Sequence, residues 1–138
     1  MKMNKYLVLE TDGFLNVVYE EDYASCYDML KENVDGCVEC VSFINDFSKR
    51  GIDLWVNEAG KLNDLLPTIA VTKNKELVEV LNGNIVFTRV NDNGETIPLT
   101  DEDIRFIRKT LNKKIGIVRF VNLITGSELE NIVSYVEM

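Results

Sequence analysis

Three β-rich runs in residues 68–90, TIAVTKNKELVEVLNGNIVFTRV, decide the fold class of this 138-residue chain. β-Branched and aromatic residues favour extended backbone, and they concentrate in Thr68–Thr72, Glu76–Leu81 and Ile85–Val90. Lys73-Asn74-Lys75 and Asn82-Gly83 separate the runs, and both have the composition of tight turns. The stretch therefore predicts three strands, and a meander is their economical arrangement.

The residues before this stretch predict a hairpin and then a helix. Tyr6–Glu10 and Phe14–Tyr19 are β-rich and flank Thr11-Asp12-Gly13, where glycine permits a tight turn. The acidic triplet Glu20-Glu21-Asp22 precedes the helix and complements its dipole, and Asp35-Gly36 is a stop signal. Between these signals, apolar or small side chains recur at helical spacing: Tyr23, Cys26, Met29, Leu30 and Val34.

Two further strands are expected between this helix and Pro67. Cys37–Ile44 is the first, a polar loop follows over residues 45–51, and Ile52–Val56 is the second. Alternation in the second strand places Trp55 on the face opposite to its aliphatic neighbours. Asn57–Lys61 has turn composition.

The C-terminal third predicts a capped helix, a strand and a short closing helix. Thr100 is a typical N-cap residue, and acidic side chains fill the first turn after it. Ile115–Ile124 is β-rich. Ser127-Glu128-Leu129-Glu130 has the pattern of a capping box before apolar residues at helical spacing, with a strand as the alternative.

This order of elements predicts a single domain, residues 1–138, of the α+β class. It has many strands per helix and no regular β-α alternation. We expect a largely antiparallel sheet of about six to eight short strands, with two or three helices packed on it.

Composition excludes several classes of function. The chain has no histidine, which removes Ser-His-Asp and Cys-His catalysis and imidazole metal ligands. A net charge of −8 disfavours nonspecific binding to nucleic acid or anionic lipid. No secretory or transmembrane segment is recognisable. Three cysteines, an odd number, predict a reducing cytoplasm rather than a disulfide framework.

The Cys37-x-x-Cys40 pair has the spacing of a metal or redox site. In a strand, however, residues three apart point to opposite faces, and the chain offers no second pair and no histidine to complete four ligands. We therefore interpret both as buried structural thiols. No metal or cofactor is predicted. The acidic runs Glu20–Asp22 and Asp101–Asp103 are interpreted as helix capping rather than acid-base catalysis.

Two groups of residues are candidate binding sites. In the first group, Asn57, Glu58 and Lys61 would form a polar recognition loop beside Trp55, whose ring would stack on a planar ligand. The alternative is a plain turn next to a core tryptophan. The second group is the basic face of the helix that follows Thr100, and it consists of Arg105, Arg108 and Lys109. This face is either simply solvated or a site for phosphates or for an acidic patch of a protein.

Three stretches resemble the family known as domain of unknown function 3846. They are VDGCVECV over residues 34–41, IDLWVNEAGKL over residues 52–62, and residues 84–111 with the Leu99–Ile104 helix start. The resemblance covers about residues 5–111 and leaves 112–138 as a C-terminal extension. Family members tend to have a double proline after the turn, where this chain has Leu65-Leu66-Pro67. The resemblance implies an accessory protein of a phage or mobile element, and it implies no activity.

We therefore predict a non-catalytic accessory protein that binds a host protein, with proteins of defence or replication as the candidates. One alternative is a small-molecule or nucleotide binder that uses Trp55 and the basic helix. A second alternative is an acidic DNA mimic that inhibits a DNA-binding enzyme. An enzyme is not expected, because no spacing selects a nucleophile with a base. A homodimer would cover open sheet edges.

Overall fold

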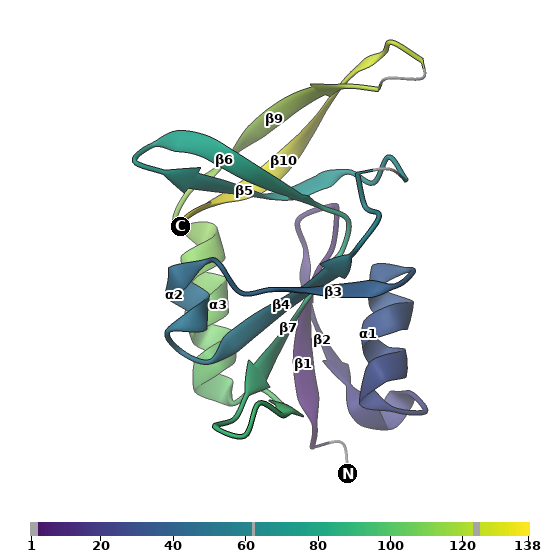
Figure 1. The fold of residues 1–138 in the computed structure, drawn as a ribbon, viewed down its shortest axis with the longest axis vertical. Coiled ribbons are helices and arrows are strands. Elements are labelled where there is room, and N and C mark those ends of the chain that lie inside the picture. Colours follow the sequence, from purple (N-terminus) through teal and green to yellow (C-terminus); the bar gives the residue numbers. More distant parts are fainter. Residues whose placement is uncertain (1–2, 62, 123–124) are drawn as a thin grey trace.

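The computed structural model describes residues 3–61, 63–122 and 125–138, and it shows two β-sheets with helices on both sides of the larger one (Figure 1). The helical elements are η1 (Glu20–Asp22), α1 (Cys26–Val34), α2 (Asn45–Ser48) and α3 (Asp101–Asn112). The strands are β1 (Lys5–Leu9), β2 (Leu15–Tyr19), β3 (Val38–Val41), β4 (Ile52–Asn57), β5 (Pro67–Lys73), β6 (Glu76–Asn82), β7 (Ile85–Val90), β8 (Thr96–Ile97), β9 (Ile115–Val121) and β10 (Glu128–Glu137). The α+β class is confirmed.

We call the two sheets A and B. Sheet A has the strand order β2-β1-β7-β4-β3, with β8 paired to β7, and all of its pairs are antiparallel. Sheet B has the order β6-β5-β10-β9, in which β10 and β5 are parallel. The expected hairpin of β1 and β2 is confirmed, with Leu7 opposite Val17 and Gly13 at φ +89° in the turn.

The expected meander of residues 68–90 is wrong. β5 and β6 do form a hairpin in sheet B, but β7 leaves it and lies between β1 and β4 in sheet A. The physical reason is burial. Residues 85–88 of β7 are all buried, whereas the first five residues of β6 are exposed or half-buried. A strand without a polar face is stable only where both faces of the sheet are covered.

Helices cover the two faces of sheet A. Alternation along β1 sends Tyr6 and Val8 to one face, where they pack with Met29, Leu30 and Val34 of α1. The opposite face belongs to a larger core that includes α2 and α3 together with apolar residues of both sheets. Figure 1 shows α1 on one side of the strands, with α2 and α3 on the other.

Two local predictions around these helices are wrong. The acidic triplet forms the separate turn η1, and α1 begins only at Cys26, capped by the Ser25 hydroxyl, which accepts a bond from the Asp28 amide at 3.1 Å. A serine cap satisfies a free helical amide, so it decides where the helix starts. The expected polar loop at residues 45–51 contains the one-turn helix α2, which buries Phe47.

The chain ends in a strand, so the expected closing helix is wrong and its alternative is correct. β10 pairs with β9 along one edge and with β5 along the other. This pairing on both sides overrides a local helical pattern, because strand preference depends on tertiary context. Of the expected strand Ile115–Ile124, the last two residues lie outside the described part of the chain.

Candidate functional site

The turn after β4 forms one wall of a cleft with a volume of about 200 Å³. β3 and the residues following it supply a second wall, and the end of β6 supplies the third. Three of the predicted site residues, Asn57, Glu58 and Lys61, therefore lie in one place.

Asn57 holds this wall in position. Its side chain is buried, and its amide group donates to the carbonyl oxygens of Val34 and Asp35 at 3.2 and 3.1 Å. Its side-chain oxygen accepts a bond from the Ala59 amide at 2.8 Å. Asp35 has a left-handed backbone, φ 60°, and ends α1. Asn57 thus ties the end of α1 to the turn, and these bonds occupy its polar atoms.

The charges around the cleft favour a cationic group over an anion. Glu39, Glu58 and Glu79 line it together with one base, Lys61. The Lys61 ammonium pairs with the Glu79 carboxylate, and this hydrogen bond lowers the pKa of Glu79. Lys61 is thus engaged by a partner of its own, so a phosphate would compete with Glu79 for it.

A neighbouring polar atom in this wall has no partner. The Asn82 amide nitrogen donates to the Leu65 carbonyl at 2.7 Å, which orients the side chain. Its carbonyl oxygen is buried and accepts no hydrogen bond from the residues that the structure describes. A buried acceptor without a donor costs stability, and no role for it follows from its surroundings.

Trp55 does not belong to the cleft. It is half-buried, packs against the α1 cluster, and donates its indole N–H to the Thr88 hydroxyl at 2.9 Å. It lies, as alternation along the strand predicts, on the face opposite Ile52 and Leu54, which belong to the core under α3.

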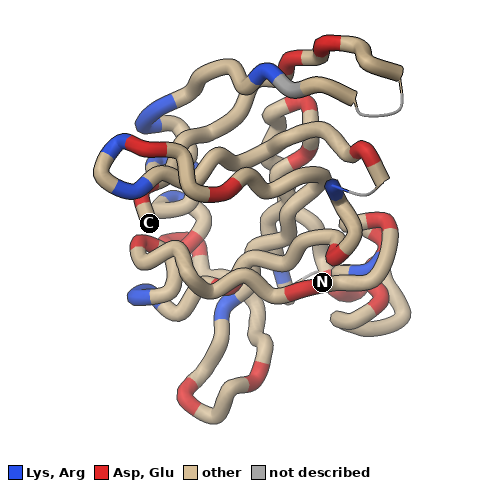
Figure 2. The backbone as a smooth tube through the Cα atoms, turned by 45° about the horizontal axis from the view of Figure 1, so that its top comes forward, with Lys and Arg blue, Asp and Glu red and all other residues tan. Residues whose placement is uncertain are grey.

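The predicted basic residues, Arg105, Arg108 and Lys109, are exposed on α3. Because α1 and α3 cover opposite faces of sheet A, the structure does not bring this basic face together with Trp55. Lys and Arg positions are otherwise scattered among Asp and Glu positions across the molecule (Figure 2). The two halves of the expected nucleotide site are therefore separate surfaces.

The prediction that Cys37 and Cys40 are buried is wrong, because both residues are exposed. The reason is that β3 is an edge strand of sheet A, of which only Val41 is buried. Partial removal from water and the nearby Asp53 carboxylate raise the pKa of Cys40 to about 11. Burial likewise raises the pKa of Cys26. Thiols with raised pKa values are poor nucleophiles at neutral pH.

The described residues contain no group of three or more cysteine, aspartate or glutamate side chains placed to hold a metal ion. Within the same residues, no helix is long and apolar enough to span a bilayer.

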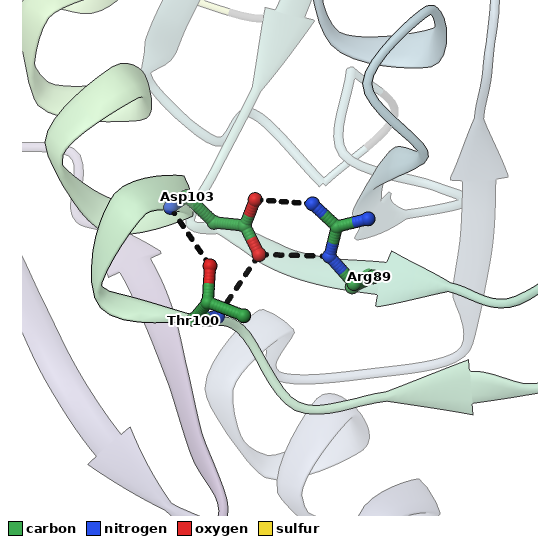
Figure 3. Close-up of polar contacts among 3 residues, drawn as sticks. All are labelled: Arg89, Thr100 and Asp103. Carbon is green, nitrogen blue, oxygen red and sulfur yellow. Dashed lines mark hydrogen bonds and ion pairs between the residues drawn. The ribbon is translucent and has the colours of Figure 1, made fainter.

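The most buried charge in the described chain is the carboxylate of Asp103, which the sequence analysis missed as an ion-pair partner (Figure 3). Arg89 of β7 donates to both of its oxygens, with Nε to Oδ2 at 2.8 Å. Thr100 and Asp103 also bond to each other's backbone amides at 3.1 and 2.9 Å, which completes a capping box. The spacing Thr100-x-x-Asp103 is the signal that predicts the capping box. This cluster is structural, because it fixes the start of α3 on β7.

The same cluster predicts a pH dependence of stability. Burial acts to raise the pKa of Asp103, but the bonds from Arg89 and Thr100 outweigh it and hold the pKa below the usual value. The ionised carboxylate therefore stabilises the fold above the unfolded-state pKa of about 4, and this contribution is lost as the pH falls below it. We expect urea unfolding to show a fall in stability between about pH 5 and pH 3 that Asp103→Asn reduces. An identical pH profile in Asp103→Asn would contradict this assignment.

A second surface, which the sequence analysis did not identify, lies on the hairpin of β9 and β10. It consists of four aliphatic side chains that are each more than half exposed: Ile115, Ile117, Val121 and Ile132. Ile117 lies directly opposite Ile132, and alternation places the β9 members on the same face. We call these four residues the hairpin patch. β9 is also the end strand of sheet B, so one of its backbone edges is open.

Comparison with known proteins places most of the chain in a protein family. Residues 3–112 match the model of a protein family described as domain of unknown function (DUF3846). No curated protein and no solved structure matches the chain. The family match ends with α3, so β9 and β10, and the hairpin patch with them, lie beyond it.

Proposed function

The chain belongs to the DUF3846 family, and from that premise we propose that it is a non-catalytic accessory protein that binds another protein. We propose a host protein as the partner, and a phage or mobile element as the carrier of this chain. The observation that carries protein binding is the hairpin patch. Aliphatic side chains gathered on an open edge strand are typical of interaction surfaces.

The surroundings of the patch support this proposal. Arg119 and Glu130 lie on the same face, between the Ile117–Ile132 pair and Val121, and form an exposed ion pair, with Nε and Oε2 3.4 Å apart. The ion pair thus borders the isoleucines Ile115, Ile117 and Ile132, and charged groups at the border of an apolar centre are usual in a protein interface. Because the patch follows the family match, the choice of partner is a property of this chain rather than of the whole family.

The ionisable groups support a binding role rather than catalysis. The thiols of Cys26 and Cys40 have raised pKa values, and the Asp103 carboxylate is engaged by Arg89 and Thr100. These groups are in protonation states that suit structural contacts. Exposed free thiols at Cys37 and Cys40 also suit a reducing cytoplasm, which we propose as the location.

A capture experiment with matched variants tests the proposal. Tagged wild type, Ile117→Asp and Leu77→Asp are incubated with lysate of the natural host, and the retained proteins are quantified by mass spectrometry. Leu77 is a matched control, because it is 54% exposed on β6, the opposite edge strand of sheet B. We expect wild type and Leu77→Asp to retain the same stoichiometric protein. Ile117→Asp should lower its affinity by roughly tenfold to a hundredfold, the equivalent of one buried aliphatic side chain.

Circular dichroism should show that all three proteins are folded alike. Equal capture by all three would show that the hairpin patch is not the interface. Failure of wild type to retain any protein stoichiometrically would contradict a protein partner.

A further inference from the structure

We propose that β10 is a separable segment of this chain that docks on the edge of β5 in the manner of an extended peptide ligand. The segment lies parallel to β5 and is recognised by four of its side chains: Asn131, Val133, Val136 and Glu137. This inference is independent of the host partner proposed above.

The main core is built almost entirely by the family-matched part of the chain. All of its buried members except one lie between Leu7 and Leu111, within the family match. Among the described residues, the exception is Val136. β5, the strand that β10 joins, lies within the family-matched residues. Its residues Ile69, Ala70 and Val71 are each 0% exposed with β10 in place. β10 therefore adds to an edge that the family domain presents.

The docking contacts combine a backbone ladder with buried side chains. Residues 134–137 pair in register with residues 69–72 of β5. Val133 and Val136 are 2% and 3% exposed, so both are buried in the docked state. In strand addition, the main-chain bonds supply affinity and the side chains supply specificity.

Polar side chains hold the segment at both ends. The Asn131 amide nitrogen donates to the carbonyl oxygens of Thr11 and Pro67 at 3.0 and 2.6 Å. At the other end, the Glu137 carboxylate accepts bonds from the Thr72 hydroxyl at 2.6 Å and the Asn74 amide at 2.7 Å. These contacts set both the register and the direction of the segment, as expected for a peptide ligand.

The test separates β10 from the chain without removing it. A protease recognition sequence is inserted between Gly126 and Ser127, which are both exposed, and the full-length protein is cut there. A fluorescent synthetic peptide with the sequence of residues 127–138 is then added in excess, and its anisotropy is measured. The cut protein should take up the peptide, and the uncut protein should not, because its own β10 fills the site.

Peptide variants separate docking on β5 from pairing with β9. Unlabelled peptides are used to displace the fluorescent one. The variants Val136→Ala and Glu137→Ala each remove contacts to the β5 side, and each should displace it about tenfold less effectively than the original sequence. Ile132→Ala is the matched control, because Ile132 is exposed and lies opposite Ile117 of β9, and it should compete within about twofold of the original peptide.

Three results would overturn the proposal. They are no uptake by the cut protein, equal competition by all three peptide variants, and loss of amide-exchange protection in β1 and β7 when the cut segment is removed. The last result would show that β10 is an integral part of the core. The assay contains no host protein, so its outcome does not depend on the partner proposed above.

Discussion

Asp103→Ala is expected to lower the free energy of unfolding by about 3 kcal/mol, because it leaves the Arg89 guanidinium in a partly buried site without its carboxylate. The Arg89 side chain is 29% exposed, so water compensates part of the loss, and this places the effect at the lower end of the range for broken buried pairs. The substitution also removes the hydrogen bond that the Thr100 backbone amide donates to the Asp103 carboxylate, so the first turn of α3 loses its reciprocal cap.

Urea unfolding of matched variants measures this effect. Glu102→Ala is the control, because Glu102 is an exposed acid in the same helical turn, and it should change stability by less than about 0.5 kcal/mol. The double variant Arg89→Ala with Asp103→Ala should lose less than the sum of the two single variants, because the second truncation removes the unpaired charge. Additive losses, or a loss below about 1 kcal/mol in Asp103→Ala, would show that the ion pair does not hold α3 on β7.

Phe87→Ala is expected to lower the free energy of unfolding by about 4 kcal/mol. Phe87 is 0% exposed in the central strand β7, and its ring contacts Phe47 of α2 edge to face, with centroids 5.5 Å apart. Truncation would leave a cavity between β7 and α2 that a rigid sheet does not close.

Thermal and urea unfolding of three variants test this prediction. Phe14→Ala is the matched control, because Phe14 is 67% exposed at the β1–β2 turn, and it should change stability by less than about 0.5 kcal/mol. Phe87→Leu fills most of the volume of the phenyl ring and should lower the free energy of unfolding by about 1.5 kcal/mol. The comparison with Phe14→Ala therefore remains possible if Phe87→Ala does not fold. Equal stability of Phe87→Ala and Phe14→Ala would contradict the core that the structure describes.

The sequence predicted local structure well where neighbouring residues decide it. The β1–β2 hairpin follows from a glycine turn between two β-rich runs, and the start of α3 follows from Thr100 and the acids after it. The membership in the family was also predictable from the sequence, since the three quoted stretches lie within residues 3–112. Alternation correctly placed Trp55 opposite Ile52 and Leu54.

The candidate site was only partly predictable. Asn57, Glu58 and Lys61 are close in sequence and share one turn, so a local argument brings them together correctly. The distance between Trp55 and the basic face of α3 depends instead on which face of sheet A each helix covers. That choice involves α1 and α3, which are far apart in the chain, and no local pattern contains it.

The sequence by itself thus determined the α+β class, the turns, the capped helix and the family. Only the tertiary structure decided that β7 enters sheet A, that residues 128–137 form a strand, that Cys37 and Cys40 are exposed, and that the hairpin patch exists. The physical reason is the separation along the chain of the residues whose contacts decide each feature. Turn and cap preferences come from atoms a few residues apart, whereas strand partners and burial are set by contacts between distant segments, whose combined free energy exceeds local preference.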